Sequence, residues 1–255
     1  MGFDAAWLDL RAPADDRARD PGLMARAVAH AGVGARLLDL GCGTGATARA
    51  FAEAGAIAPR WCLVDNDPAL LALARERHPA AELRCQDLRD IDALPLDGIG
   101  MVTASALFDL VSGDWLERLV ARLARGRVAL HAALSYDGEM RWTPEDPDDA
   151  AVTERFNRHQ RGDKGFGPAL GPEAAVRLIA LFEAHGYAVR SAPSPWRLGP
   201  RDAALHEALL AGIADAAQET GLRAAPDWAA RRRAGIGAAQ AEIGHVDVLA
   251  LPGGG

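Results

Sequence analysis

The chain has 255 residues, of which 49% are hydrophobic and 25% charged, with 28 Lys and Arg against 35 Asp and Glu. This composition is typical of a globular protein and excludes disordered and fibrous chains. The net charge of −7 argues against binding to nucleic acid, because neutralising phosphates requires clustered cations. No apolar run approaches the ~18 residues of a membrane span, and residues 1–4 do not begin a secretion signal. We expect a cytoplasmic, bacterial-type enzyme or binding domain without nucleic-acid or membrane partners.

The cysteines and the lysine content add two points. Cys42, Cys62 and Cys85 form no Cys-x-x-Cys pair, so the sequence predicts neither a zinc site nor a disulfide framework. Lys164 is the only lysine, and Ala and Arg are unusually frequent. We interpret this bias as genome composition, so Arg-rich stretches are not taken as motifs.

Predicted strands and helices alternate along the first half of the chain. Residues 1–32 predict a helical segment, which ends at Gly32-Val33-Gly34. Short apolar runs then predict strands over 36–40, 61–65, 82–85, 99–103 and 127–134. Helical patterns between them cover 46–54 and begin again at Pro68 and after Ser112. Such alternation is typical of βαβ units and a parallel sheet.

The second half is less regular. Residues 137–170 are polar, with one predicted helix at 149–160, and Pro172 opens another. A strand at 187–191, helices at 201–220 and 227–240, and an alternating strand at 244–250 complete the prediction. The fold class is α/β: a Rossmann-like, mostly parallel sheet of seven strands with helices on both faces, an antiparallel last strand and helical additions.

A glycine loop follows the first predicted strand in Leu37-Leu38-Asp39-Leu40-Gly41-Cys42-Gly43-Thr44-Gly45. Glycines between a strand and a helix let the backbone approach a ligand without interference from a Cβ atom. The same residues also satisfy a relaxed dinucleotide-binding fingerprint. Asp39 separates the two interpretations, because a carboxylate there disfavours a pyrophosphate and favours a cationic amino group.

This segment resembles motif I of class I S-adenosylmethionine (SAM)-dependent methyltransferases, and the resemblance extends over about residues 36–135. It implies that Asp65 accepts the ribose hydroxyls, that Asp87 accepts from the adenine amino group, and that Leu88 offers a backbone N–H. It also implies an antiparallel last strand between strands five and six. The cofactor-binding residues expected on this basis are Asp39, Gly41, Cys42, Gly43, Gly45, Asp65, Asn66, Asp87, Leu88, Ala104 and Ser105.

The charge of SAM is consistent with this assignment. SAM carries a net charge of +1, so three carboxylates at successive strand ends suit it better than a dinucleotide with two phosphates. The sequence favours SAM-dependent methyl transfer to an O or N nucleophile of a small molecule by in-line displacement, with S-adenosylhomocysteine as product. The alternatives are a non-catalytic SAM-binding or scaffold domain and a nicotinamide-dependent Rossmann enzyme.

The acceptor side lacks a comparable motif, because methyl transfer mainly requires alignment and needs a base only for a protonated nucleophile. We expect residues 137–170 to cover the acceptor pocket, with His159 and His131 as candidate catalytic residues. Tyr136, Asn157 and Trp196 are candidate substrate-binding residues. Trp7, Arg11, Arg17 and Arg19 could close over the cofactor, with one of these arginines meeting its carboxylate. No metal is expected.

We treat residues 1–255 as one methyltransferase domain. It divides into an N-terminal helical cap (1–35), a SAM-binding half (36–135), a substrate-side insert (137–170) and a C-terminal half (171–255). The oligomeric state is open, with a homodimer as one alternative.

Overall fold

The computed structural model describes residues 4–253. Residues 1–3, where the predicted N-terminal helical segment begins, and residues 254–255 lie outside this range. Within it, one sheet of eight strands has the order β3-β2-β1-β4-β5-β8-β6, and β7 pairs with β8. The strands are β1(Arg36–Leu40), β2(Arg60–Asp65), β3(Glu82–Cys85), β4(Met101–Ser105), β5(Ala129–Thr143), β6(Tyr187–Pro193), β7(Trp196–Leu198) and β8(Gln240–Pro252).

This topology confirms the predicted fold class. Strands β1 to β5 pair in parallel, and β8 runs antiparallel between β5 and β6, as expected for the last strand. The strand count was wrong, because the short β7 brings the total to eight among the described residues. Strand β4 also begins two residues later than expected, at Met101.

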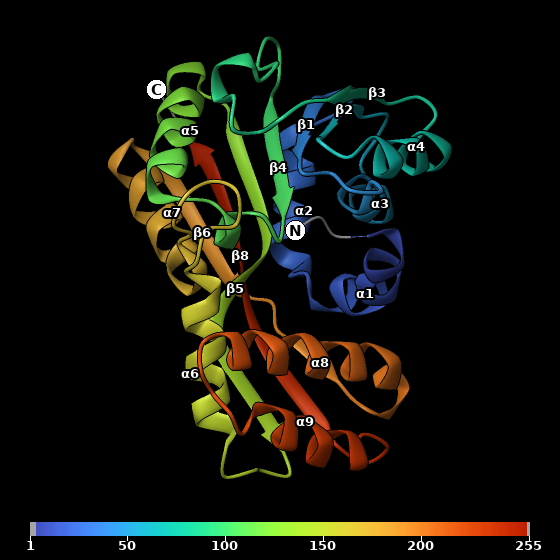
Figure 1. Cartoon of the computed structure of the whole chain (residues 1–255). Helices are drawn as coiled ribbons and strands as arrows, with labels where there is room; N and C mark the ends of the chain where they lie inside the picture. Colours follow the sequence, from blue (N-terminus) through green and yellow to red (C-terminus); the bar gives the residue numbers. More distant parts are fainter. Residues whose placement is uncertain (1–3, 254–255) are drawn as a thin grey trace.

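Helices cover both faces of the sheet (Figure 1). The helices are α1(Ala5–Ala18), α2(Pro21–Ala31), α3(Ala46–Glu53), α4(Pro68–Arg77), α5(Gly113–Gly126), α6(Asp149–Gln160), α7(Ala174–Ala184), α8(Ala203–Glu219) and α9(Ala225–Ala234). Single turns of 3₁₀-helix are η1(Ile91–Ala93), η2(Phe108–Leu110), η3(Gly171–Glu173) and η4(Pro200–Asp202). The predicted segment 1–32 is therefore two helices. They are separated where Asp20 accepts a hydrogen bond from Leu23 N (2.7 Å) and caps α2.

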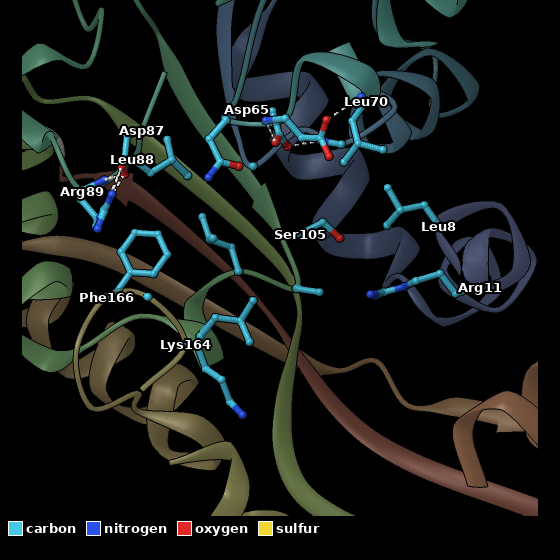
Figure 2. Close-up of a pocket in the computed structure, with 18 residues that line it drawn as sticks. Leu8, Arg11, Asp65, Leu70, Asp87, Leu88, Arg89, Ser105, Lys164 and Phe166 are labelled. Atoms are coloured by element: carbon cyan, nitrogen blue, oxygen red, sulfur yellow. Dashed lines mark hydrogen bonds and ion pairs between the residues drawn. The ribbon is translucent and has the colours of Figure 1, made fainter. Parts of the chain in front are cut away.

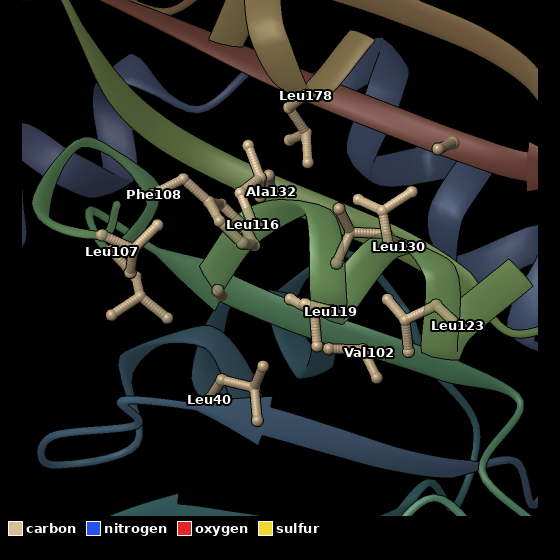
Figure 3. Close-up of a cluster of buried hydrophobic side chains, with 14 of the residues drawn as sticks. Leu40, Val102, Leu107, Phe108, Leu116, Leu119, Leu123, Leu130, Ala132 and Leu178 are labelled. Atoms are coloured by element: carbon tan, nitrogen blue, oxygen red, sulfur yellow. The ribbon is translucent and has the colours of Figure 1, made fainter. Parts of the chain in front are cut away.

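Two apolar clusters hold these layers to the sheet. Because successive side chains of a strand point to opposite faces, Leu38 and Leu40 of β1 join the cluster of α5 and α7, whereas Leu37 joins that of α2, α3 and α4. Figure 3 shows Leu116, Leu119 and Leu123 of α5 packed on the strands of the first cluster. Burying each of these leucines contributes about 1.5–3 kcal/mol.

Strands β5 and β8 are much longer than the predicted 127–134 and 244–250. Their pairing shifts register between Ala132 and Ser135 and again between Tyr136 and Met140. These irregularities interrupt the alternation of apolar side chains, which is why residues 137–143 were wrongly predicted to lie outside the sheet. The predicted helix 149–160 is confirmed as α6.

The extended ends of β5 and β8 support a second body, which we call the cap. It consists of those ends with β7, α6, α8 and α9, and it has its own core around Trp142, Trp228 and Ile213. In Figure 1 the cap occupies the lower part of the molecule, and α1 lies beside it. None of the helices within residues 4–253 is both long and apolar enough to span a membrane.

Candidate functional site

A cavity of about 420 Å³ lies at the carboxyl ends of the parallel strands. Residues from the loops after β1, β2, β3 and β4 line one part of it. Helix α1 contributes Leu8 and Arg11, and the loop after α6 contributes Lys164, Gly165 and Phe166. Figure 2 shows Asp65 and Asp87 along the upper side of this view and Arg11 and Lys164 below them. Asp65 and Asp87, with Arg89 beside Asp87, therefore lie at one end, and Arg11 and Lys164 lie at the other.

The glycine loop brings its backbone to the cavity. Gly41 and Gly43 line the cavity with φ of +63° and +51°, a region that favours glycine. A Cβ atom on Gly43 would lie 2.9 Å from Leu8 Cδ1, so a side chain there would push against α1. Gly45 has another role: it begins α3 with φ +87°, and its Cβ would lie 2.3 Å from the His78 ring. The structure places Gly45 outside the cavity lining.

Asp65 joins this loop to the cavity wall. One carboxylate oxygen accepts from Gly43 N (2.8 Å) and the other from Asp67 N (3.0 Å). A carboxylate offers about four acceptor positions, so about two remain for a ligand. Asn66 and Asp67 line the cavity beside it. This acceptor set suits a pair of hydroxyl groups.

Asp87 and Leu88 form the next part of the wall. The Leu88 carbonyl accepts from Trp115 Nε1 (2.8 Å), which fixes this backbone against α5. Asp87 is half-exposed and forms an ion pair with Arg89, and the hydrogen bonds from Arg89 hold the pKa of the carboxyl below its ordinary value. An adenine amino group would share Asp87 with Arg89.

Ser105 lines the cavity, and the buried Arg19 contacts Ser105 without lining the cavity itself. Arg19 Nη2 donates to Ser105 Oγ (3.0 Å). Its Nε and Nη1 atoms are buried and have no hydrogen-bond partner among the described residues. Unpaired buried donors are costly, so this guanidinium is suited to an anionic group such as an amino-acid carboxylate. The predicted neighbour Ala104 is 1% exposed and lies in the core of the sheet.

Asp39 does not line the cavity, contrary to its predicted cofactor contact. It is 1% exposed and accepts from Thr103 Oγ1 (2.7 Å) on β4. Burial raises the pKa of Asp39 to about 7. Asp39 is the fourth residue of β1 and points to the face covered by α3, beneath the glycine loop. Cys42 is also buried, and it lines only a small cavity of about 60 Å³ under α1.

The catalytic role predicted for His131 does not fit its position. His131 pairs with Thr103 across β4 and β5, is fully buried, and packs edge-on against Phe51. Burial lowers the pKa of this imidazole to about 3. The histidine is a core side chain away from the cavity.

The predicted substrate-binding residues instead join the sheet to the cap. Tyr136 OH donates to Asn157 Oδ1 (2.7 Å), and Asn157 Nδ2 donates to the Gly138 carbonyl (2.9 Å). Trp196 is buried in the cap core and donates through Nε1 to Asp15 (2.9 Å). None of these three residues lines the cavity, because their hydrogen bonds are used to fasten β5 to α6 and β7 to α1.

His159 does not line the cavity, but it contacts Lys164, which does. Its Nδ1 is 3.1 Å from Lys164 Nζ, and its Nε2 is 3.1 Å from Glu219. Lys164 itself is a lining residue. The sequence pointed to the right segment, since Lys164 lies in the polar stretch after α6, but not to the residue that faces the cavity.

Several lining residues were not predicted as site residues. Leu70, Phe166 and Leu110, the last residue of η2, add apolar surface. Their sequence signals were the same as those of core residues, so they could not be separated without the fold. The buried Asp109 of η2 lies beside this wall, and burial raises the pKa of its carboxyl to about 6.

Together these residues fit the expected cofactor. A glycine cradle, hydroxyl acceptors at Asp65 and unpaired cationic donors at Arg19 provide complementary groups for the ribose and for an amino-acid end. The acidic residues Asp65, Asp67 and Asp87 on one wall disfavour a pyrophosphate.

Comparisons with known proteins were made for the sequence and for the fold. No curated protein sequence matches the chain. Among solved structures, the cyclopropane synthase MmaA2 from Mycobacterium tuberculosis is 14% identical, with 90% of this chain and 83% of that chain covered at a TM-score of 0.48. A geranyl diphosphate methyltransferase in complex with SAM is 14% identical. The match covers 91% of this chain and 84% of that chain at a TM-score of 0.48. A putative sarcosine dimethylglycine methyltransferase from Galdieria sulphuraria is also 14% identical. The match covers 91% of this chain and 85% of that chain at a TM-score of 0.48.

The comparison with family models concerns the segment of the chain that carries the glycine loop. A family model described as a methyltransferase domain matches residues 37–128, from the second residue of β1 to the residue before β5. This match confirms the resemblance drawn from the loop and from the acidic residues after β2 and β3. Residues 37–128 of the chain are therefore similar to the methyltransferase domain family.

Proposed function

We propose that the protein transfers a methyl group from SAM to an oxygen or nitrogen nucleophile of a small molecule. The observation that carries the proposal is one cavity that combines the glycine loop with the acceptors of Asp65 and Asp87. The buried cation Arg19 lies next to it and donates to the lining residue Ser105. When bound, SAM supplies an activated methyl group, so the protein mainly has to bind and align the reactants.

Each part of the cavity wall has a role in this proposal. Asp65 would hold the ribose, and Leu88 would offer its backbone N–H to adenine, with Asp87 accepting from the amino group. Arg19 would meet the carboxylate of the methionine part, which places the methyl group near Ser105. Asp67 supports this choice over a nicotinamide dinucleotide, because a third carboxylate on the wall would repel its phosphates.

The size and cover of the cavity support a small acceptor. Its volume of about 420 Å³ lies in the lower part of the range for small-molecule sites, roughly 300–1,000 Å³. Leu8 of α1 and Phe166 of the loop after α6 restrict access from two sides. We also propose that the chain works as a single domain, since β5 and β8 run through both the sheet and the cap.

Ligand-dependent melting tests the cofactor. SAM or S-adenosylhomocysteine at ~100 times its dissociation constant should add roughly 2.7 kcal/mol to the stability of the folded state, whereas NAD and NADP should add little. Turnover is tested with SAM and a panel of small alcohols, phenols and amines, by measuring S-adenosylhomocysteine. A melting shift with NAD alone would overturn the proposal. SAM binding without turnover on any acceptor class would favour the non-catalytic alternative.

A further inference from the structure

Lys164 lies at the end of the cavity away from the expected cofactor contacts. In Figure 2 its side chain runs away from Asp65 and Asp87, so its amine lies on the side left for the acceptor. Lys164 belongs to the loop between α6 and η3, and Asp163 holds this loop by accepting from Gly165 N (2.7 Å) and Gly167 N (3.1 Å). The position of the lysine is therefore set by a hydrogen-bonded turn.

Two further side chains extend from the lysine toward the surface. Lys164 Nζ lies 3.1 Å from His159 Nδ1, and His159 Nε2 lies 3.1 Å from Glu219 Oε2. A carboxylate can only accept, so the neutral imidazole carries its hydrogen on Nε2, and Nδ1 accepts from the lysine. The exposed fraction of the side chain is 27% for His159 and 65% for Glu219. The three groups thus connect the cavity wall to solvent.

The charged groups around the amine come from four elements. His159 is on α6, Glu219 on α8 and Asp109 on η2, while Arg11 of α1 lines the same cavity. Burial lowers the pKa of Lys164, and the charges of Glu219 and Asp109 oppose this effect. Arg11 is already paired with Asp15 through two hydrogen bonds (2.9 and 3.1 Å). Of the two cations at this end of the cavity, Arg11 is therefore paired with a carboxylate. Among the residues that the structure describes, Lys164 has no carboxylate in hydrogen-bond contact.

The identity of this residue matters for its chemistry. Lys164 is the only lysine among the 28 Lys and Arg residues of the chain, and it is one of 18 residues that line the cavity. An arginine at this position would carry the same charge but would not deprotonate, whereas the amine of a partly buried lysine can. A lysine followed by a histidine and a carboxylate is suited to moving a proton.

We propose that Lys164 accepts the proton of the acceptor during methyl transfer, and that His159 and Glu219 position the amine and carry the proton to solvent. The inference rests on the proposed function and narrows the acceptor to one whose nucleophile is protonated before the reaction, an alcohol, a phenol or an N–H group. The O–H or N–H proton moves to the lone pair of neutral Lys164. The nucleophile then bonds to the methyl carbon, and the electron pair of the C–S bond passes to sulfur. The ammonium afterwards returns its proton through His159 Nδ1.

The single lysine makes a direct test possible. Protein labelled with ¹⁵N on lysine side chains gives one Nζ resonance, which can be followed from pH 6 to pH 11. We expect a pKa below the ordinary lysine value of ~10.4, because burial disfavours the ammonium. Glu219→Gln removes a charge that stabilises the ammonium, and His159→Leu removes its hydrogen-bond acceptor, so both should lower the Lys164 pKa further. Glu207→Gln on the exposed side of α8 and His185→Leu after α7 are matched controls, and neither should move it.

Two outcomes would overturn the proposal. One is an Nζ group that titrates like an ordinary lysine and does not respond to changes at residues 159 and 219. The other is a Lys164→Arg variant that retains wild-type turnover on an acceptor from the panel, because we expect its kcat to fall by ~10²–10⁴-fold although the charge is kept. SAM affinity is measured in parallel and should stay within about twofold in this variant. If the wild-type protein does not bind SAM, the proposed function fails. The titration of Lys164 needs no SAM, so it distinguishes that failure from a failure of the lysine assignment.

Discussion

At the scale of single residues, Asp65 combines a structural role with the binding role that we propose for it. Its two oxygens hold Gly43 N and Asp67 N, and its 8% exposure places the carboxylate at the cavity wall with little access to bulk water. Asp65 ends β2 and belongs to none of the apolar core clusters. The structure indicates a cost, because its loss leaves two backbone donors unpaired.

We therefore expect Asp65→Ala to have two effects. SAM affinity should fall by about 2–3 kcal/mol, the size of hydrogen bonds to a charged group, and thermal stability should also decrease. Calorimetric titration with SAM and a melting curve measure the two effects separately. Asp92→Ala, an exposed carboxylate at η1, is the control and should change neither. SAM affinity equal to that of the wild type in a folded Asp65→Ala protein would show that the ribose is not held here.

Asp39 predicts a pH dependence of stability. Burial raises its pKa from 3.8 to about 7 in the folded state. Below about pH 4, the carboxyl is protonated in both the folded and the unfolded chain and costs nothing. Between pH 4 and pH 7 the unfolded chain loses this proton while the folded chain keeps it, so the free energy of unfolding falls as the pH rises. Above pH 7 the penalty is constant, at most about 4 kcal/mol for a shift of this size.

Asp39→Asn removes this titration and keeps an acceptor for Thr103. In urea unfolding at pH 5 and pH 8, the variant should lose less stability than the wild type on going to the higher pH. Asp92→Asn serves as the control for a carboxylate that is exposed. Identical pH dependence in the wild type and Asp39→Asn would contradict the assignment of a protonated, buried carboxyl.

At the scale of elements, α1 and the loop after α6 close the cavity from two sides. Leu8 and Arg11 come from α1, while Gly165 and Phe166 come from the loop. Packing of Trp115 against Phe166, with ring centroids 5.6 Å apart, holds the loop to α5. A ligand in the cavity would therefore contact both elements, although neither belongs to the segment matched by the family model.

Hydrogen exchange tests this arrangement. Binding of S-adenosylhomocysteine should slow amide exchange over residues 5–18 and 161–168, because opening of these elements would expose the bound ligand. Residues 225–234 of α9, on the far side of the cap core, should exchange at the same rate with and without ligand. Slower exchange confined to residues 41–45, with none in α1, would mean that the helix does not cover the site.

The elements also show which parts of the fold the sequence could predict. The strands from β1 to β3 were placed within one residue. The runs of β1 and β2 end at Gly41 and Asp65, and β3 ends at Cys85, two residues before Asp87. Strand β5 was not, since Asp137, Gly138 and Glu139 interrupt its pattern where the register shifts. Strand β7 has three residues and a partner far along the chain, so no local pattern marks it.

The same limit applies to the candidate site. Gly41, Gly43 and Asp65 could be placed at the cavity from the sequence, because their positions depend on local geometry at the end of a strand. His159 could not be separated from Lys164, because which of two neighbouring polar side chains faces a cavity depends on the packing of α6 against α8. Asp39 and His131 could not be excluded, because the depth of a residue beneath the end of its strand depends on α1 and α3.

At the scale of the whole molecule, the sheet and the cap share β5 and β8, and the cavity lies at the end of the parallel strands near α1. The proposed cofactor contacts come from the sheet, and Lys164 comes from the chain that returns from the cap. In our proposal, the adenosine part of the cofactor, its amino-acid part and the methyl acceptor therefore share one cavity. This arrangement is the central claim, and it predicts the orientation of the ligand as well as its presence.

A crystal structure of the protein with S-adenosylhomocysteine tests that claim most directly. We predict the adenine beside Leu88 and Asp87, the ribose hydroxyls on Asp65, and the carboxylate of the ligand toward Arg19. The sulfur should then lie near Ser105, with Lys164 on its open side. Density for the ligand outside this cavity, or with its adenine at Arg19 and its carboxylate at Asp87, would contradict the account.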